Sequence, residues 1–293
     1  MIPRPSSTSQ TWRSLQHFYK NRGALISMLF ILLVALIAIL APLLAPHNPT
    51  QLFTDTLRLP PAWNPLGNAN FLLGSDDLGR DTLSRLIHGA RISLGIGFTV
   101  VTISGLVGSI MGLLAGYFGG TIDRVISGAI DMLMALPSVL LAIVIISVLG
   151  PGVTNAVIAV SFVALPGFTR IMRSAGIEEM GKEYVVAAQA IGASHLRIMF
   201  KEILPNSLSP MIVQASLGFS DAILNSAALG FLGLGVQAPA PEWGVMLSDA
   251  RPFIESSPWM VTLPGLSILL VVLAFNLMGN GLRDSLDPKL RQR

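Results

Sequence analysis

The residue types that usually perform catalysis or bind metals are few and scattered in this 293-residue sequence. It contains no cysteine, which excludes disulfides and thiolate metal sites. No histidine belongs to a His-Glu-x-x-His pattern, and no glycine-rich loop ends in the Lys-Ser/Thr pair that cradles nucleotide phosphates. The four histidines are dispersed: His17, His47, His88 and His195. We therefore predict no catalytic residue, no metal site and no nucleotide site in this chain.

Two carboxylates, Asp131 and Asp221, each interrupt a long apolar run. An ionisable group within a membrane is costly and is by default a candidate for function. Asn225 follows Asp221 by about one helical turn, so the two polar side chains share a helix face. Asp131 precedes Pro137, where a helix break would need a local hydrogen-bond partner. A structural role, paired with a neighbouring subunit, remains open for both carboxylates.

Two further polar groups lie outside the apolar runs. One comprises Asp76, Asp77, Arg80 and Asp81, and the other contains Glu242 and Trp243. Such groups could dock a partner protein. The alternative is a solvated helix start, because an aspartate near a helix N-terminus interacts favourably with the helix dipole.

The elements that must position these residues are apolar helices. Hydrophobic residues make up 52% of the chain and charged residues only 12%, with a mean hydropathy of +0.67. Soluble domains carry roughly 25% charged residues, and a helix needs about 20 apolar residues to cross a bilayer. Six stretches approach or exceed that length with at most one charge: 23–45, 92–122, 125–149, 153–169, 207–236 and 259–282. We predict an all-α polytopic membrane protein with six transmembrane helices.

The basic residues predict the orientation of these helices. With the N-terminus inside, the inner segments hold 14 of the 19 lysines and arginines, and the outer segments hold five. This asymmetry predicts cytoplasmic N- and C-termini. It also accounts for the basic pI without a nucleic-acid partner. The predicted order is a cytoplasmic tail at 1–22, a first helix at 23–45, an extracytoplasmic segment at 46–91, a five-helix core at 92–285 and a cytoplasmic tail at 286–293.

Glycines recur every four residues in the second predicted helix, at Gly108, Gly112, Gly116 and Gly120. Small residues at this spacing let another helix approach closely, which favours association in lipid. We interpret this stripe as a packing seam within the bundle rather than a permeation groove.

The cytoplasmic segment 183–206 is long and helical in pattern. Gly192 suits the left-handed position that ends a helix, Ser194 can cap a second helix, and Pro205 terminates it. Two short amphipathic helices joined at a glycine are therefore expected. They would dock into a groove of a cytoplasmic partner or rest on lipid headgroups.

This segment resembles the EAA loop of ABC-importer permeases, matching it at Ala187, Ala188, Gly192, Leu204 and Pro205. Val186 and Glu202 depart from the general pattern, whereas residues 184–193 are similar to the peptide-importer branch. Five further segments resemble the same branch, which belongs to the peptide/opine/nickel group: 73–81, 131–137, 227–235, 241–249 and 275–288. The resemblance covers about residues 15–293 and is nearest to the second, C-type membrane subunit of bacterial dipeptide transporters.

The resemblance implies a type I ABC-importer permease fold with a cytoplasmic coupling helix, in a bacterial inner membrane. It implies a second homologous permease, two cytoplasmic ATPase subunits that bind ATP and Mg, and a periplasmic peptide-binding protein. This chain, surrounded by lipid, would form half of the path through which dipeptides or short peptides move by alternating access. It would have no enzymatic activity and no cofactor of its own. The residues implied in ATPase coupling are Glu183, Tyr184, Ala187, Ala188, Gly192, Ala193, Leu204 and Pro205.

On this interpretation Asp221, Asn225 and Asp131 are candidates for the substrate path. The candidates for docking the binding protein are Asp76, Asp77, Arg80, Asp81, Glu242 and Trp243. Alternatives are a permease of the same group for nickel, opine, haem or oligopeptide, and, more distantly, a stand-alone secondary carrier. Secondary carriers often show internal repeats, and we find no convincing repeat between the two halves.

Overall fold

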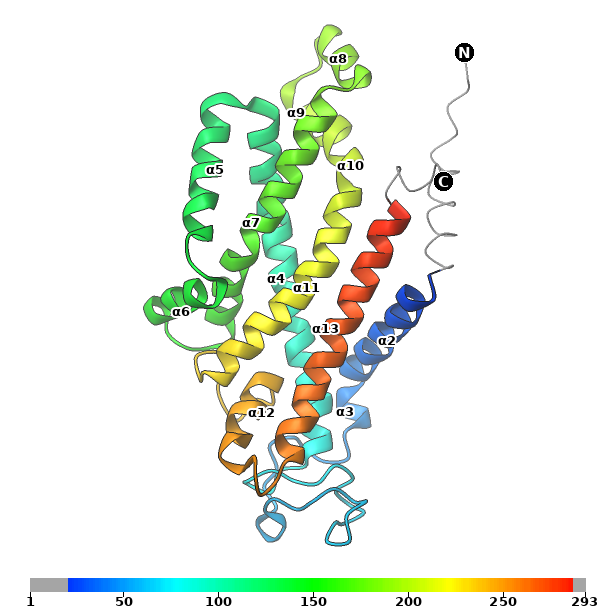
Figure 1. Cartoon of the computed structure of the whole chain (residues 1–293), viewed down its shortest axis with the longest axis vertical. Helices are drawn as coiled ribbons and strands as arrows, with labels where there is room; N and C mark the ends of the chain where they lie inside the picture. Colours follow the sequence, from blue (N-terminus) through cyan, green and yellow to red (C-terminus); the bar gives the residue numbers. More distant parts are fainter. Residues whose placement is uncertain (1–20, 287–293) are drawn as a thin grey trace.

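The computed structural model describes residues 21–286, and every regular element among them is a helix. The predicted tails at 1–22 and 286–293 lie almost wholly outside this range. Figure 1 shows most of the long helices extending along the longest axis of the molecule, with α6 lying across it and the short helices α8–α10 at one end. The segment between α3 and α4 and the short helix α12 lie at the opposite end.

The long helices are those that could enter a membrane. They are α2 (Arg22–Ile39), α4 (Thr82–Phe118), α5 (Gly120–Met134), α6 (Ser138–Leu149), α7 (Val153–Met180), α11 (Leu208–Phe231) and α13 (Trp259–Leu286). The short helices are α3 (Ala41–Leu44), η1 (Thr54–Thr56), α8 (Glu183–Ala190), α9 (His195–Arg197), the π-helical turn η2 (Ile198–Ile203), α10 (Leu204–Asn206), α12 (Trp243–Ala250) and η3 (Arg251–Phe253).

Four of the described helices are long and apolar enough to cross a membrane: α2, α4, α7 and α13. The α5–α6 pair adds a fifth if it counts as one bent span. The remaining predicted span corresponds to α11, which has 24 residues but carries Gln214, Asp221 and Asn225. Six transmembrane helices therefore stay a prediction, whereas an all-helical protein with four to five apolar spans is what the structure shows.

Helix α4 begins earlier than the charge-free run that starts at Ile92. Its N-cap is Asp81, whose carboxylate accepts a hydrogen bond from the Ser84 amide at 2.9 Å. The helix then continues for 37 residues, about 55 Å at 1.5 Å per residue. It is thus longer than the roughly 30 Å core of a bilayer, and its first turns hold charged side chains.

The third predicted span, 125–149, is not a straight helix. Helices α5 and α6 meet at 93° across the break between Met134 and Ser138. Pro137 lies in that break, and it cannot donate the amide hydrogen that a continuous helix requires. The sequence predicted a break at this proline, and the structure shows how sharply the chain turns.

Helices α4 and α7 pack together along the glycine seam. A Cβ atom on Gly112 would lie 2.4 Å from the Thr169 carbonyl oxygen, so a side chain cannot fit there. A Cβ atom on Gly108 would lie 2.7 Å from the Phe168 Cβ, and one on Gly116 would lie 2.8 Å from the Arg173 carbonyl oxygen. Gly120 does not belong to the seam, because it starts α5 with a φ of +53° and faces open space. Three of the four glycines therefore confirm the prediction of a packing seam.

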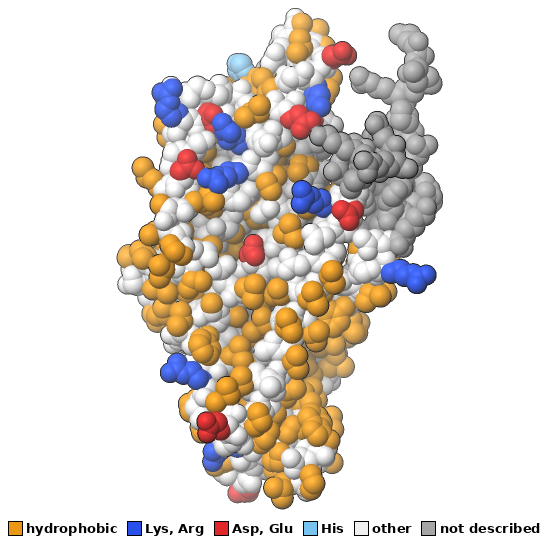
Figure 2. Space-filling view, viewed as in Figure 1, with side chains coloured by type: hydrophobic (Ala, Val, Ile, Leu, Met, Phe, Trp, Pro, Cys, Tyr) orange, Lys and Arg blue, Asp and Glu red, His pale blue; other side chains and the backbone are white. Residues whose placement is uncertain are grey.

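The outer surface of the bundle is largely apolar. Large hydrophobic side chains are exposed on α2, α4, α6 and α13. On the face shown in Figure 2, charged side chains gather around the end formed by α5 and α8–α10, and few lie over the middle of the bundle. This distribution fits a belt of lipid around the long helices.

Candidate coupling and transport sites

Segment 183–206 forms a compact group of helical turns at one end of the molecule (Figure 1). Helix α8 ends at Ala190, and Gly192, two residues later, has a φ of +76°. The Gly192 amide donates to the Gln189 carbonyl, and the Ala193 amide donates to the Ala188 carbonyl, both at 3.0 Å. This pair of bonds is a Schellman motif, which needs a left-handed residue at the glycine position. Ser194 then caps the next helix through the Arg197 amide, as predicted.

The inner side of this segment is anchored to the bundle. Val185, Ile198 and Ile203 are fully buried and pack in one cluster with Leu113 of α4 and Met172 of α7. Burial of these side chains fixes the short helices, which would be marginal alone. Segment 183–206 is therefore packed against α4 and α7 rather than projecting as a free loop.

Two polar contacts add to this anchor. The Tyr184 hydroxyl donates a hydrogen bond to the carboxylate of Glu179 at the end of α7. Burial, followed by this negatively charged neighbour, raises the pKa of Tyr184. The Tyr117 hydroxyl of α4 lies 2.7 Å from Nδ1 of His195. Both contacts join the short helices to long ones.

The outer side of the segment carries apolar side chains in solvent: Val186, Ile191, Leu196 and Phe200. Ile191 is 81% exposed and Leu196 is 68% exposed. The predicted coupling residues divide between the two sides. Those exposed are Glu183, Ala187, Gly192 and Pro205, and those half-buried are Tyr184, Ala188, Ala193 and Leu204. An anchored apolar surface of this kind suits docking into a groove of another protein.

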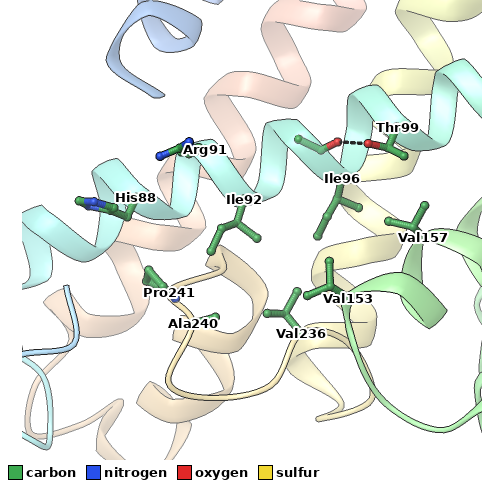
Figure 3. Close-up of a pocket in the computed structure, with 11 residues that line it drawn as sticks. His88, Arg91, Ile92, Ile96, Thr99, Val153, Val157, Val236, Ala240 and Pro241 are labelled. Atoms are coloured by element: carbon green, nitrogen blue, oxygen red, sulfur yellow. Dashed lines mark hydrogen bonds between the residues drawn. The ribbon is translucent and has the colours of Figure 1, made fainter. Parts of the chain in front are cut away.

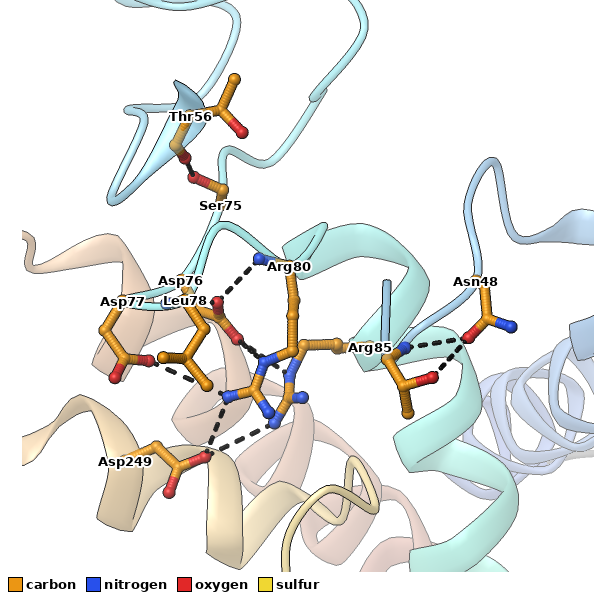
Figure 4. A network of polar contacts seen from close by, with 10 residues as sticks. Asn48, Thr56, Ser75, Asp76, Asp77, Leu78, Arg80, Arg85 and Asp249 are labelled. Carbon is orange, nitrogen blue, oxygen red and sulfur yellow. Dashed lines mark hydrogen bonds and ion pairs between the residues drawn. The ribbon is translucent and has the colours of Figure 1, made fainter. Parts of the chain in front are cut away.

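A network of charges occupies the other end of the molecule (Figure 4). Arg80 and Arg85 lie side by side, 3% and 2% exposed, between the carboxylates of Asp76 and Asp249. The Arg80 Nε lies 2.6 Å and the Arg85 Nε 3.3 Å from the same Asp76 oxygen. Both Nη2 atoms reach one Asp249 oxygen, at 3.4 and 3.5 Å. The network joins the segment before α4 to the first turn of α4 and to α12.

Asp77 lies at the edge of this network, with its Oδ1 3.9 Å from Arg80 Nη2. Its pKa is raised, first because burial disfavours the carboxylate and second because Asp76 is close. The other members of the predicted docking groups are buried. Asp81 caps α4, Glu242 caps α12 through the Val245 amide at 2.9 Å, and Trp243 donates its indole hydrogen to the Leu86 carbonyl.

Of the six residues predicted to dock a binding protein, Asp77 is therefore the one that keeps a partly exposed side chain. The burial of the other five does not fit the alternative of a solvated helix start, although Asp81 and Glu242 do cap helices. Their docking role stays a prediction.

The two carboxylates in apolar runs have different surroundings. Asp131 of α5 pairs with Arg170 of α7, with 2.6 Å between Oδ1 and Nη2. Asp221 is exposed on α11 and makes no ion pair with any residue from 21 to 286. Asn225 does not hold its carboxylate, because the Asn225 amide donates to the Asp221 main-chain carbonyl at 2.8 Å. Their place in a substrate path stays a prediction.

The sequence interpretation missed several partners of these groups. Arg85, Arg170 and Glu179 were not singled out, nor was the pair formed by Asp123 and Arg173. Asp123 and Arg170 directly follow an apolar run and Arg173 lies close to one, whereas Arg85 and Glu179 lie farther from the runs. Opposite charges at adjoining ends of helices would have been a usable signal, because isolated charges there are costly.

Comparison with known proteins defines the class of protein. Residues 108–292 match the family described as binding-protein-dependent transport system inner membrane component. Residues 9–61 match the N-terminal TM domain of oligopeptide transport permease C. The chain belongs to the family of binding-protein-dependent transport system inner membrane components, and it is a permease subunit of an ATP-driven importer rather than an enzyme.

Individual relatives extend over almost the whole chain. The chain is 53% identical to the di/tripeptide transport system permease protein DppC of Pseudomonas aeruginosa, over 98% of this chain and 94% of the relative. It is 54% identical to the dipeptide transport system permease protein DppC of Escherichia coli K12, over 94% and 92% respectively. Identity to DppC of Alkalihalophilus pseudofirmus is 47%, over 99% of this chain and 97% of that protein.

Solved structures agree on the fold. A chain of the MetNI methionine ABC transporter, in an inward-facing conformation, matches with a TM-score of 0.55, over 69% of this chain and 94% of that chain. A second crystal form of the same transporter gives a TM-score of 0.54, over 69% of this chain and 97% of that chain. Sequence identity is 20% and 21% respectively, so these structures support the ABC-importer permease fold and nothing about substrate.

Proposed function

We propose that the chain is the C-type permease subunit of a bacterial inner-membrane importer for dipeptides or short peptides. The observation that carries this proposal is 47–54% identity, over nearly the full length, to permeases named for dipeptide transport. A second permease, two ATPase subunits that bind ATP and Mg, and a periplasmic peptide-binding protein would complete the importer. Both termini would be cytoplasmic, with α8–α10 on the cytoplasmic side.

Segment 183–206 is the coupling element in this proposal. Its apolar outer side, with Ile191 and Leu196 exposed, would sit in a groove of one ATPase. Its inner side is packed against α4 and α7. Because the anchor is rigid, a displacement of the segment would be transmitted to both long helices and would change access to the path between the two permeases.

The substrate path would be bordered by α11, where Asp221 is exposed in an apolar stretch. An exposed carboxylate is unfavourable against lipid and favourable in an aqueous path, where it can attract the α-amino group of a peptide. Asp131 is a weaker candidate, because Arg170 already pairs with it. We therefore place Asp221 nearer the substrate than Asp131.

Reconstitution tests the proposal. The chain is assembled with its companion permease, ATPases and binding protein in proteoliposomes, and uptake of a radiolabelled dipeptide is measured with and without ATP. We expect uptake that depends on ATP, on the binding protein and on this chain. Uptake of nickel, opine or haem in place of dipeptide would assign another substrate of the same group. Uptake by this chain alone would instead identify a secondary carrier.

A further inference from the structure

A hollow beside the first half of α4 is not used by the coupling segment or by the charge network. It has a volume of about 550 Å³ and is walled by α4, the start of α7 and the connection from residue 236 to residue 241 (Figure 3). This size falls within the roughly 300–1,000 Å³ of small-molecule sites. It lies toward the end of α4 that adjoins α12 (Figure 1).

The centre of this hollow is apolar. Figure 3 shows Ile92 and Ile96 of α4 directed toward Val236 and Ala240 of the connection, with Val153 of α7 beside them. Val236 is 3% exposed and Ile96 is also 3% exposed, so the wall is packed from behind. Such a wall suits an aliphatic or aromatic side chain.

One end of the hollow is cationic. His88, one turn before Ile92, and Arg91, directly before Ile92, border this end (Figure 3). Nδ1 of His88 lies 3.0 Å from the Ser84 carbonyl oxygen, so it carries the proton in that bond. None of the eleven residues that line the hollow is acidic. The adjoining acid, Glu242, is 1% exposed and caps α12 instead.

Arg91 differs from the arginines that hold the bundle together. Arg80, Arg85, Arg170 and Arg173 each lie within 4.0 Å of a carboxylate. Arg91 is exposed and has no ion pair or hydrogen bond to any residue in the described part of the chain. A guanidinium in an apolar setting is costly without an anion, and its planar fork of donors matches a carboxylate.

We propose that this hollow is a subsite for the C-terminal carboxylate of a short peptide, which Arg91 binds, while the apolar wall receives the neighbouring side chain. The inference rests on the proposed function, since it takes a peptide as the transported molecule. The proposal assigns to Arg91 the recognition of the C-terminal carboxylate, which all free peptides have. One cation and an apolar wall would accept many peptide sequences.

Affinity labelling tests the subsite without requiring transport. Because the chain has no cysteine, Ala240→Cys places its single thiol in the wall. N-bromoacetyl-dialanine and its C-terminal amide are added to the importer assembled in nanodiscs, and alkylation of this chain is followed by mass spectrometry. We expect the carboxylate probe to react about tenfold faster than the amide, as a charge-assisted hydrogen bond predicts. Leu66→Cys, at a residue 79% exposed outside the hollow, corrects for reagent reactivity.

Two substitutions decide whether Arg91 is responsible. Arg91→Gln should bring the rate ratio to about one, and Arg91→Lys should keep part of it. Arg251→Gln removes an exposed cation outside the hollow and should leave the ratio unchanged. Equal rates with Arg91 present would overturn the subsite. A preference for the carboxylate probe that persists in Arg91→Gln would also overturn the subsite. The guanidinium would then be assigned to a lipid phosphate or to an acid of the second permease.

Uptake measured in parallel separates the two proposals. If the parent importer fails to take up dipeptide while the labelling preference persists, the proposed function fails and the anion subsite stands. If uptake proceeds and the preference is absent, the subsite fails and the proposed function stands.

Discussion

The two ends of the helix bundle hold their polar residues in opposite ways. At the α12 end, Arg80 and Arg85 are buried between carboxylates, and the network ties three stretches of chain together. At the α8 end, the short helices are held by apolar packing and a few hydrogen bonds, and their outer side is exposed. The first arrangement resists displacement, whereas the second presents a surface. We infer that the α12 end provides the fixed frame and the α8 end receives the partner.

The substitution with the greatest predicted effect is in the buried charge network at the α12 end. Arg85→Gln leaves Asp76 and Asp249 with a single buried cation, and breaking a buried pair in this way costs about 3–5 kcal/mol. We expect a large fall in the unfolding temperature of the detergent-solubilised chain. Arg251→Gln removes an exposed arginine at the same end and should change it little. Equal stability of the two variants would show that the buried network does not fix this end.

A second substitution tests the α8 end. Gly192→Glu places a bulky, charged side chain where φ is +76°, which costs about 1–2 kcal/mol and opens the Schellman motif. We expect dipeptide uptake to fall about tenfold, with little change in the unfolding temperature of the bundle. Gly192→Asn is the matched control, because asparagine adopts the left-handed conformation more readily. Normal assembly and uptake with Gly192→Glu would contradict the coupling role.

The smallest expected effect is pH-dependent and concerns Asp77. Because its pKa is raised in the folded protein, the carboxylate opposes folding once the pH rises through that value, and protonation removes the cost. Asp77→Asn should therefore stabilise the chain slightly at pH 7, by less than about 1 kcal/mol. The gain should vanish below the ordinary aspartate pKa of about 3.9. A gain that grows as the pH falls would contradict the assigned direction.

Much of the fold could be predicted because its signals are local. The apolar runs that became α2, α7 and α13 were recognised from length and lack of charge. Gly192 and Ser194 were placed correctly, since a left-handed turn and a helix cap depend on adjacent residues. The count of six spans stays a prediction, because the polar residues of α11 weaken its hydropathy.

The burial and pairing of the charged side chains could not be predicted in the same way. Asp76, Asp81 and Glu242 suggested a docking surface, but their side chains are buried. Asp76 lies in the arginine network, and Asp81 and Glu242 cap helices. Asp131 suggested a hydrogen-bond partner near the helix break at Pro137 or a pair with a neighbouring subunit; the break is present, and Asp131 pairs with Arg170, 39 residues away. Such outcomes depend on which helices become neighbours.

Hydropathy and helix-ending residues act over a few turns, so the sequence was sufficient to predict a helical membrane protein with short helices over residues 183–206. Which ionisable groups are paired and which are unpaired depends instead on tertiary packing. Arg85 is enclosed by carboxylates from two other segments, whereas Arg91, six residues later on the same helix, faces an open hollow. The free-energy cost of a charge is set by its neighbours in space, and packing of distant segments supplies those neighbours.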